Sequence, residues 1–299
     1  MDSSTIFRIH IPDGYSFRNA MGIAKTETER TTMILCRNII EFNVHNVNTK
    51  KAYHNIVLKG NELVEYKLDS KDKSGKQLDY YYCTFEVGVM FNATRGTGKK
   101  DGLLLQLDEG KNSIIVRRLK SGEEQGQVSF AVVSLLREIP PTRATEPGTY
   151  QELPNIKILT KSFSELCNKV AGNQCKELNF MEYLGGVLLV GIKTDNSWGT
   201  CDKFGEVPLS AFSMNASSAI ESKKSKTEDE SNNSHVKSVR VPISTIKALS
   251  KINNIAPQNS VLKIYFSKTD QIVKLNCQVS SYGEYSCYLF NERRIKIEK

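Results

Sequence analysis

Two segments of the chain carry the same helical pattern of apolar side chains. In each segment the apolar residues follow the spacing i, i+3, i+4, i+7, which places them on one face of a helix. The matching sets are Phe17, Ala20, Met21 and Ala24 in the first half, and Phe163, Leu166, Cys167 and Val170 in the second. An alternating segment typical of a strand precedes each helix, at 6–12 and at 156–159. The pattern therefore predicts an internal duplication.

Each predicted helix is followed by a hairpin and then by a second helical stripe. The hairpins are predicted at 33–36 with 39–44 and at 177–183 with 187–192. The second stripes are Val87, Met90, Phe91 and Thr94, and the longer set Ile243, Ile246, Leu249 and Ile252. Further strands follow, with turns at 109–110 and 268–270. Each half thus consists of strand, helix, strands, helix and strands, which indicates an α+β fold class.

A proline-rich segment lies between the halves. Four of the eight prolines fall between 140 and 154. Proline fixes φ and lacks a backbone donor, so this stretch disfavours helices and central strands. We expect an extended connector at 136–154, between an N-terminal domain at 1–135 and a C-terminal domain at 155–299. A Ser-rich segment of mixed charge at 215–235 predicts a flexible loop inside the second domain.

Cationic side chains gather on the polar faces and at the ends of the predicted helices. They are Arg18 and Lys25, then Arg95, Lys99 and Lys100, then Lys161 and Lys169, and finally Lys247 and Lys251. The chain carries a net charge of +8 and has a pI near 9.0. Since a solvated helix face usually mixes both signs, the pattern favours contact with DNA phosphates over plain solvation. No base-reading motif is present, so we expect binding that is independent of sequence.

The sequence lacks the motifs of catalysis and metal binding. "ATRGTGKKDG" fails as a phosphate loop because Ala93 and Lys100 stand where Gly and Ser or Thr are needed. The four histidines have no metal-ligand spacing. The seven cysteines form no C-x-x-C pair, and we expect them to be reduced. We therefore expect no enzyme activity, no catalytic residue, no metal and no cofactor, in an intracellular protein without a membrane span.

Several stretches resemble the DNA sliding clamps of the proliferating cell nuclear antigen (PCNA) family. "IFRIHIPDGYSFRNAMGIAK" is similar to the family's opening strand and helix, and "ELVEY", ending at Tyr66, to its Phe-x-x-Tyr strand. "IKILTKSFSELCNKV" resembles the start of the second domain, and "SYGEYSCYLF" the Gly-x-x-x-Tyr-Tyr-Leu ending. The resemblance implies a DNA clamp fold: two similar domains, each with antiparallel sheets outside and two helices inside, joined in a closed ring of three subunits.

The resemblance also implies a function. A clamp of this kind is a processivity factor that encircles duplex DNA and tethers a DNA polymerase and other replication and repair proteins, after a clamp loader has placed it on DNA. The expected location in the cell is the nucleus or a viral replication site. The positions that match the family's DNA-facing residues are Arg18, Lys25, Lys169 and Lys251, with Lys247, Lys99 and Lys100 nearby.

Subunit and partner contacts are implied in the same way. Strand pairing between subunits would join Ser113–Leu119 to 187–193 of the next chain, with Ile114, Val116, Val187, Leu189 and Ile192 at the interface. The apolar run at 187–192 is equally compatible with an interior strand. A partner peptide would bind beneath the connector, in a pocket formed by Val44, Tyr53, Leu136, Ile272, Tyr288, Leu289 and Phe290, with Leu136 and Leu153 flanking the connector as a strap.

The chain departs from the family pattern at several places. Phe290-Asn291 replaces the family's Ala-Pro, two loops are longer than usual, and the connector has extra prolines. This divergence suits a clamp from a large DNA virus or a remote eukaryote. Two alternatives remain open: a processivity factor that binds DNA as a monomer or dimer without closing a ring, and a clamp-like scaffold subunit of a checkpoint or transcription complex.

Overall fold

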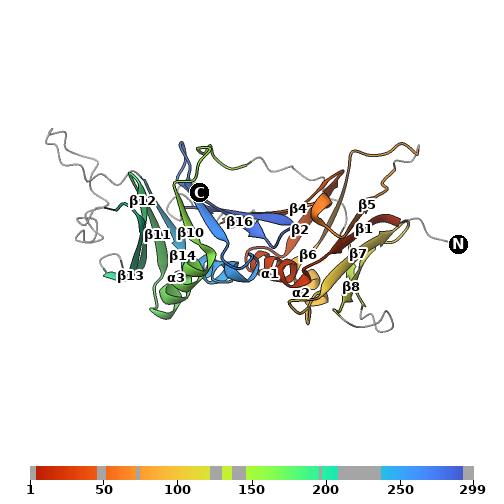
Figure 1. The fold of residues 1–299 in the computed structure, drawn as a ribbon, viewed down its shortest axis with the longest axis horizontal. Coiled ribbons are helices and arrows are strands. Elements are labelled where there is room, and N and C mark those ends of the chain that lie inside the picture. The colour runs from red at the N-terminus through yellow and green to blue at the C-terminus, as the bar shows by residue number, and fades with distance from the viewer. Residues whose placement is uncertain are drawn as a thin grey trace.

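The structure is a computed structural model that describes residues 5–45, 52–71, 75–121, 130–136, 146–194, 197–207 and 237–291. The loop expected at 215–235 and residues 137–145 of the connector lie outside these ranges. In the described residues, four α-helices lie in a row on one side of three antiparallel sheets (Figure 1).

The first half follows the expected order. Its helices are α1 (Gly14–Ala24) and α2 (Val87–Ala93), with a short 3-10 helix η1 (Gly60–Glu62). Its strands are β1 (Thr5–Ile11), β2 (Arg30–Cys36), β3 (Ile39–His45), β4 (Ala52–Lys59), β5 (Glu65–Leu68), β6 (Tyr80–Glu86), β7 (Gly102–Asp108), β8 (Ser113–Leu119) and β9 (Phe130–Ser134). The Asp13 side chain accepts the backbone N–H of Ser16 and so caps the N-terminus of α1.

The second half repeats this order. Its helices are α3 (Thr160–Gly172) and α4 (Ile243–Leu249), followed by the 3-10 helix η3 (Ile252–Asn254). Its strands are β10 (Ile156–Leu159), β11 (Glu177–Tyr183), β12 (Gly186–Thr194), β13 (Ser197–Gly205), β14 (Lys237–Pro242), β15 (Val261–Phe266), β16 (Ile272–Val279) and β17 (Gly283–Phe290). Gly185, with φ of 94°, makes the tight turn between β11 and β12.

One sheet belongs to both halves. Its eight strands run in the order β10-β15-β16-β17-β4-β3-β2-β6, and the halves meet where β17 pairs with β4, with Tyr285 opposite Ile56. A five-stranded sheet, β5-β1-β7-β8-β9, and a four-stranded sheet, β13-β12-β11-β14, lie at the two ends. The halves are therefore joined by continuous backbone pairing in addition to the connector.

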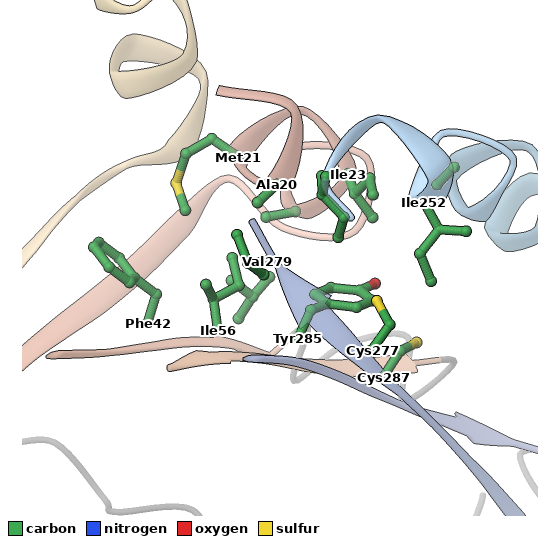
Figure 2. Packing of buried hydrophobic residues seen from close by; sticks show 14 of the residues in the cluster. Ala20, Met21, Ile23, Phe42, Ile56, Ile252, Cys277, Val279, Tyr285 and Cys287 are labelled. Carbon is green, nitrogen blue, oxygen red and sulfur yellow. The ribbon is translucent and has the colours of Figure 1, made fainter. Parts of the chain in front are cut away.

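A single hydrophobic core runs beneath the helix row. All four apolar residues of each long helix, predicted from their spacing, are buried there. Figure 2 shows Ala20, Met21 and Ile23 of α1 above Phe42 of β3 and Tyr285 of β17, so α1 packs on strands from both halves. Each large side chain buried in this way contributes about 1.5–3 kcal/mol.

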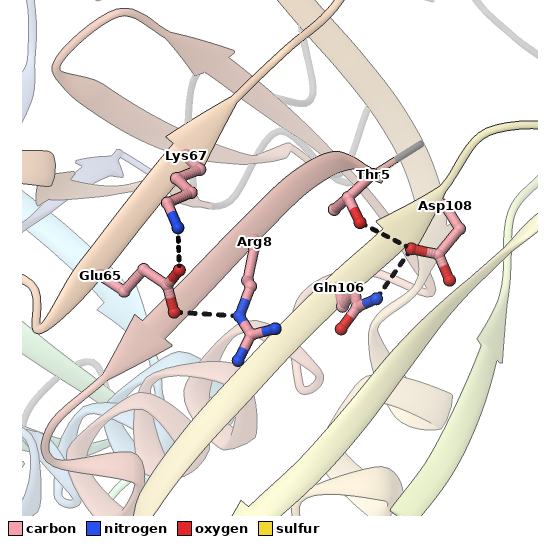
Figure 3. A network of polar contacts seen from close by, with 6 residues as sticks. All are labelled: Thr5, Arg8, Glu65, Lys67, Gln106 and Asp108. Carbon is pink, nitrogen blue, oxygen red and sulfur yellow. Dashed lines mark hydrogen bonds and ion pairs between the residues drawn. The ribbon is translucent and has the colours of Figure 1, made fainter. Parts of the chain in front are cut away.

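The opposite face of the five-stranded sheet is polar (Figure 3). Arg8 and Lys67 donate to the two carboxylate oxygens of Glu65, each at 2.9 Å. Thr5 of β1 and Gln106 of the neighbouring strand β7 both donate to Asp108. Because Phe7, Ile9 and Ile11 of β1 are buried on the other side, the alternation of β1 fixes which face is directed toward the helices.

Candidate nucleic-acid and partner-binding surfaces

The cationic residues predicted from the sequence lie in the helix layer and in the turns beside it. Eight of the nine are exposed: Lys25, Arg95, Lys99, Lys100, Lys161, Lys169, Lys247 and Lys251. Arg18 is half-buried. Four of the nine lie on the helices, whose other side is in the core, and five lie at helix ends or in the adjoining turns. The arrangement gives a long surface to which phosphate groups can bind.

A phenylalanine of α2 positions both cations of α1. The guanidinium carbon of Arg18 lies 5.6 Å from the centre of the Phe91 ring, and the Lys25 ammonium lies 5.1 Å from it. Gly22 sits between them, and a Cβ at this position would come within 2.9 Å of the Phe91 ring. The absence of a side chain at Gly22 therefore lets α2 pack closely on α1 and holds Arg18 and Lys25 side by side.

The lysines of the second half differ in whether they have an ion-pair partner. Lys169 lies 3.9 Å from Asp202, and this exposed pair weakens its availability to a phosphate only slightly. Within the described part of the chain, Lys247 and Lys251 have no ion-pair partner. They are one helical turn apart, at the end of α4 and just beyond it, so they can reach neighbouring phosphates.

A surface cavity lies where the two halves meet at the helix row. Its volume is about 630 Å³, and it is lined by Asp13, by Tyr15 and Ser16 of α1, by Lys99 and Lys161, and by the turn from Asn253 to Asn259. The fold thus brings together two lysines that are far apart in the sequence. Two ammonium groups, the Asp13 carboxylate, and amide and hydroxyl groups together make this depression polar and of mixed charge.

The residues predicted to bind a partner peptide fall into three groups. Tyr53, Ile272 and Tyr288 form a small cluster with Phe290 packed against it, and the rings of Tyr53 and Tyr288 stack with centres 5.4 Å apart. Val44 and Leu289 are fully buried in the main core below. Leu136 is half-buried and donates its backbone N–H to Thr84, whereas Leu153 is 74% exposed.

Three residues of the partner region were missed from the sequence. Tyr150 packs against the Tyr53–Tyr288 cluster, and Lys274 extends over the rings of Tyr150, Tyr265 and Tyr288. No local pattern could reveal this group, because its members come from the connector and from three different strands of the eight-stranded sheet.

The predicted strands of the subunit interface are wrong. β8 is paired on both sides, with β7 and β9, and β12 is paired on both sides, with β11 and β13. The five residues expected at the interface, Ile114, Val116, Val187, Leu189 and Ile192, are therefore buried within the chain. In the described residues β8 is covered by the edge strand β9, and β12 by the edge strand β13; the other edge strands of the three sheets are β5, β6, β10 and β14.

The apolar run of β12 has a different physical cause. Val187 and Leu189 face the helices, while Leu188 and Val190 belong to a second apolar cluster on the opposite face, with Met181. The strand is apolar throughout because both of its faces are buried. The interior-strand alternative was the correct interpretation.

The described residues hold no group of three or more His, Cys, Asp or Glu side chains that could bind a metal ion. All seven cysteines are free thiols. Burial raises the pKa of the Cys277 thiol to about 12, so it stays protonated and unreactive. No helix among the described residues has the length and apolar character needed to cross a membrane.

One histidine is enclosed in the core at the junction of the two halves. His54 of β4 lies 2.6 Å from the Tyr285 hydroxyl through Nδ1, and its Nε2 has no hydrogen-bond partner among the described residues. Burial lowers the pKa of His54 to about 4. The neutral ring is therefore a structural element of the seam between β4 and β17.

Two similar helix-on-sheet units, joined through one sheet and presenting four helices on one side, define the class of DNA clamp folds. Comparison of the structure with solved proteins leads to the same class. A chain of the PCNA2–PCNA3 complex from Sulfolobus tokodaii superposes with a TM-score of 0.66 at 12% identity, over 95% of this chain and 98% of that one. PCNA from Entamoeba histolytica superposes with a TM-score of 0.67 at 9% identity, over 96% of this chain and 98% of its own.

No protein-family model matches the sequence, and no curated protein sequence matches it either. At identities this low, the likeness to solved structures shows the fold. The PCNA clamp fold expected from the sequence resemblance is thus confirmed.

Proposed function

We propose that this protein is the subunit of a sliding clamp that closes into a homotrimeric ring around duplex DNA and tethers a DNA polymerase and other replication or repair proteins. The observation that carries the proposal is the row of four helices, one side of which is in the core, together with the nine cationic residues that lie on these helices and in the turns beside them. Such a surface binds the DNA backbone without reading bases, as movement along DNA requires.

Closure of the ring would use two of the edge strands of the described sheets, β9 and β13. β9 and β13 lie at opposite ends of the molecule, β13 on the left of Figure 1 and β9, next to β8, on the right. In β9 the side chains of Phe130 and Val132 are 70% and 50% exposed. An exposed apolar edge of this kind needs a covering strand, and β13 of the next subunit would supply it.

Partner proteins would dock on the eight-stranded sheet beside the connector. The Tyr53, Ile272 and Tyr288 cluster, with Phe290 and Tyr150 at its margin, offers aromatic surface for apolar anchors of a partner peptide. Loading by a clamp loader and a role in the nucleus or at a viral replication site belong to the same proposal.

A topological DNA-binding assay tests the proposal. A ring can thread onto linear DNA through a free end, but it cannot thread onto linear DNA whose two ends are blocked by bound streptavidin, nor onto a closed circle. With free protein present at equilibrium in about 0.15 M salt, we expect binding to free-ended DNA only, because the free end both admits and releases a sliding ring. Equal binding to all three substrates would contradict the proposal and favour a non-ring processivity factor. Binding to none would favour a protein scaffold.

A further inference from the structure

A lysine is enclosed by tyrosine rings next to the connector. The Lys274 ammonium lies 5.5 Å from the ring centres of Tyr150 and Tyr265 and 5.6 Å from that of Tyr288. Its side chain is only 20% exposed. Lys274 lies directly opposite Tyr265 on β15 and Tyr288 on β17, so strand register alone builds two walls of this cage. The connector supplies the third wall through Tyr150.

One carboxylate completes the cage. Glu146, at the start of the described part of the connector, accepts from Lys274 and also from the Tyr288 hydroxyl at 3.1 Å. The Glu146 side chain is 48% exposed, so it can leave the cage and be hydrated. Lys274 cannot be hydrated in the same way, because an ammonium that is largely removed from water needs a nearby anion or hydrogen-bond acceptor. The cage therefore favours a bound carboxylate, which is either that of Glu146 or that of a partner segment.

The connector also defines the kind of segment that fits. Glu146 and Tyr150 are four residues apart, and both contact Lys274. The chain between them is fixed by a hydrogen bond from the Tyr150 hydroxyl to Pro147 O and by one from the Lys268 N–H to Thr149 O. A short peptide with a carboxylate four residues before an aromatic residue can reproduce both contacts.

We propose that Lys274 is a specificity-determining residue that selects partner segments carrying a carboxylate four residues before an aromatic side chain, which replace Glu146 and Tyr150 in the tyrosine cage. This inference rests on the proposed function as a clamp whose partners dock beside the connector. The connector occupies the cage in the free protein, and it competes with the partner because it is attached to the same chain.

The experiment uses the connector sequence itself as the probe. The fluorescently labelled peptide EPGTYQELP, which corresponds to residues 146–154, and its variant QPGTYQELP differ only in the first side chain. Their dissociation constants are measured by fluorescence anisotropy with full-length protein carrying Glu146→Gln, in which the internal carboxylate is absent. We expect the Glu peptide to bind about tenfold more tightly than the Gln peptide, as a charge-assisted hydrogen bond requires.

Three further variants complete the test. Adding Lys274→Met to Glu146→Gln should abolish the difference between the peptides, and adding Lys274→Arg should keep it. Adding Lys263→Met, a matched control two residue pairs away on β15, should also keep it. The wild-type protein should bind the Glu peptide more weakly than Glu146→Gln does, because Glu146 competes.

Equal binding of the two peptides by Glu146→Gln, or no binding of either at millimolar concentration, would overturn the inference. So would discrimination that survives Lys274→Met in protein whose thermal unfolding is unchanged. If Lys274→Met unfolds the protein, the inference is still tested by the difference between the Glu and Gln peptides in Glu146→Gln, with and without Lys274→Arg. Binding to free-ended DNA does not depend on the cage. Failure of the proposed clamp function would therefore be seen in the DNA-binding assay, and failure of the peptide specificity in the anisotropy measurement.

Discussion

Replacing Lys247 and Lys251 with alanine should weaken DNA binding by an amount that can be worked out from the structure. Both side chains are exposed, lie next to each other on the helix side, and have no ion-pair partner among the described residues. Each is therefore free to contact one phosphate. Since each contact contributes about 0.9 to the slope of log affinity against log salt, the double variant should lose about 1.8 units for every subunit that contacts DNA.

The change in slope gives a measurable difference in affinity. Over a fourfold rise in salt, from 50 to 200 mM, the wild-type affinity should fall further than that of the variant, by about twelvefold for each subunit that contacts DNA. Fluorescence anisotropy with a labelled duplex at four or more salt concentrations gives both slopes. The duplex must be long enough for the ring to cover, and the sequence of the duplex should not matter.

A matched control removes the same charge from the other side of the molecule. Lys157 of β10 and Lys263 of β15 are cross-strand partners on the eight-stranded sheet, and Lys263 alternates with the buried Leu262 and Ile264. Their double alanine variant should keep the wild-type slope. Equal loss in both variants would refute the reasoning, because it would mean that net charge, and not the helix face, determines binding.

Three other predictions test different parts of the molecule. Phe130→Glu combined with Val132→Glu should convert the ring to monomers in light scattering without lowering the melting temperature, whereas Glu at the exposed turn residue Leu184 should leave the mass unchanged. Lowering the pH from 6.5 to 4 should cost about 3 kcal/mol of unfolding free energy, because the unfolded chain takes up a proton at His54 over this range, whereas the folded state, with a pKa of about 4, does so only at its lower end. In His54→Gln, urea titrations should show a correspondingly smaller pH dependence. Phe42→Ala should destabilise the core by about 3–5 kcal/mol in the same assay, and a loss below 1 kcal/mol would contradict its place beneath α1.

The duplication and the helix positions could be predicted from the sequence because helical periodicity is a local signal. Fourteen of the sixteen residues in the four apolar stripes are buried, and Phe91 and Ile243 are partly buried. The last stripe also differs in its secondary structure. There the helix ends at Leu249, and Ile252 lies in a separate 3-10 turn that continues the buried face. A spacing of three residues fits both geometries, so the sequence could not distinguish them.

The edges of the sheets could not be predicted in this way. An apolar run such as 187–192 occurs in an edge strand that a neighbour covers and in an interior strand buried on both faces. The pairing partner β13 carries Trp198, Cys201 and Phe204 among polar residues, a weak strand pattern. Only the fold identifies it as the strand that separates β12 from the edge.

The tyrosine cage was unpredictable for a different reason. Lys274 alternates with buried Val273 and Leu275 and looks like an ordinary outward-facing lysine of a strand. Its environment depends on Tyr288 and Tyr265 from neighbouring strands and on Tyr150 from the connector. Contacts across such distances in the chain are fixed by strand register and carry no local signal.

The mass of the protein in solution tests the central proposal most directly. Light scattering coupled to size exclusion, at moderate salt, should give about 101 kDa, the mass of three chains of 33.6 kDa. The mass should stay constant on dilution to low micromolar protein if β9 and β13 close the ring. A stable species of 33.6 kDa under these conditions would contradict the closed ring.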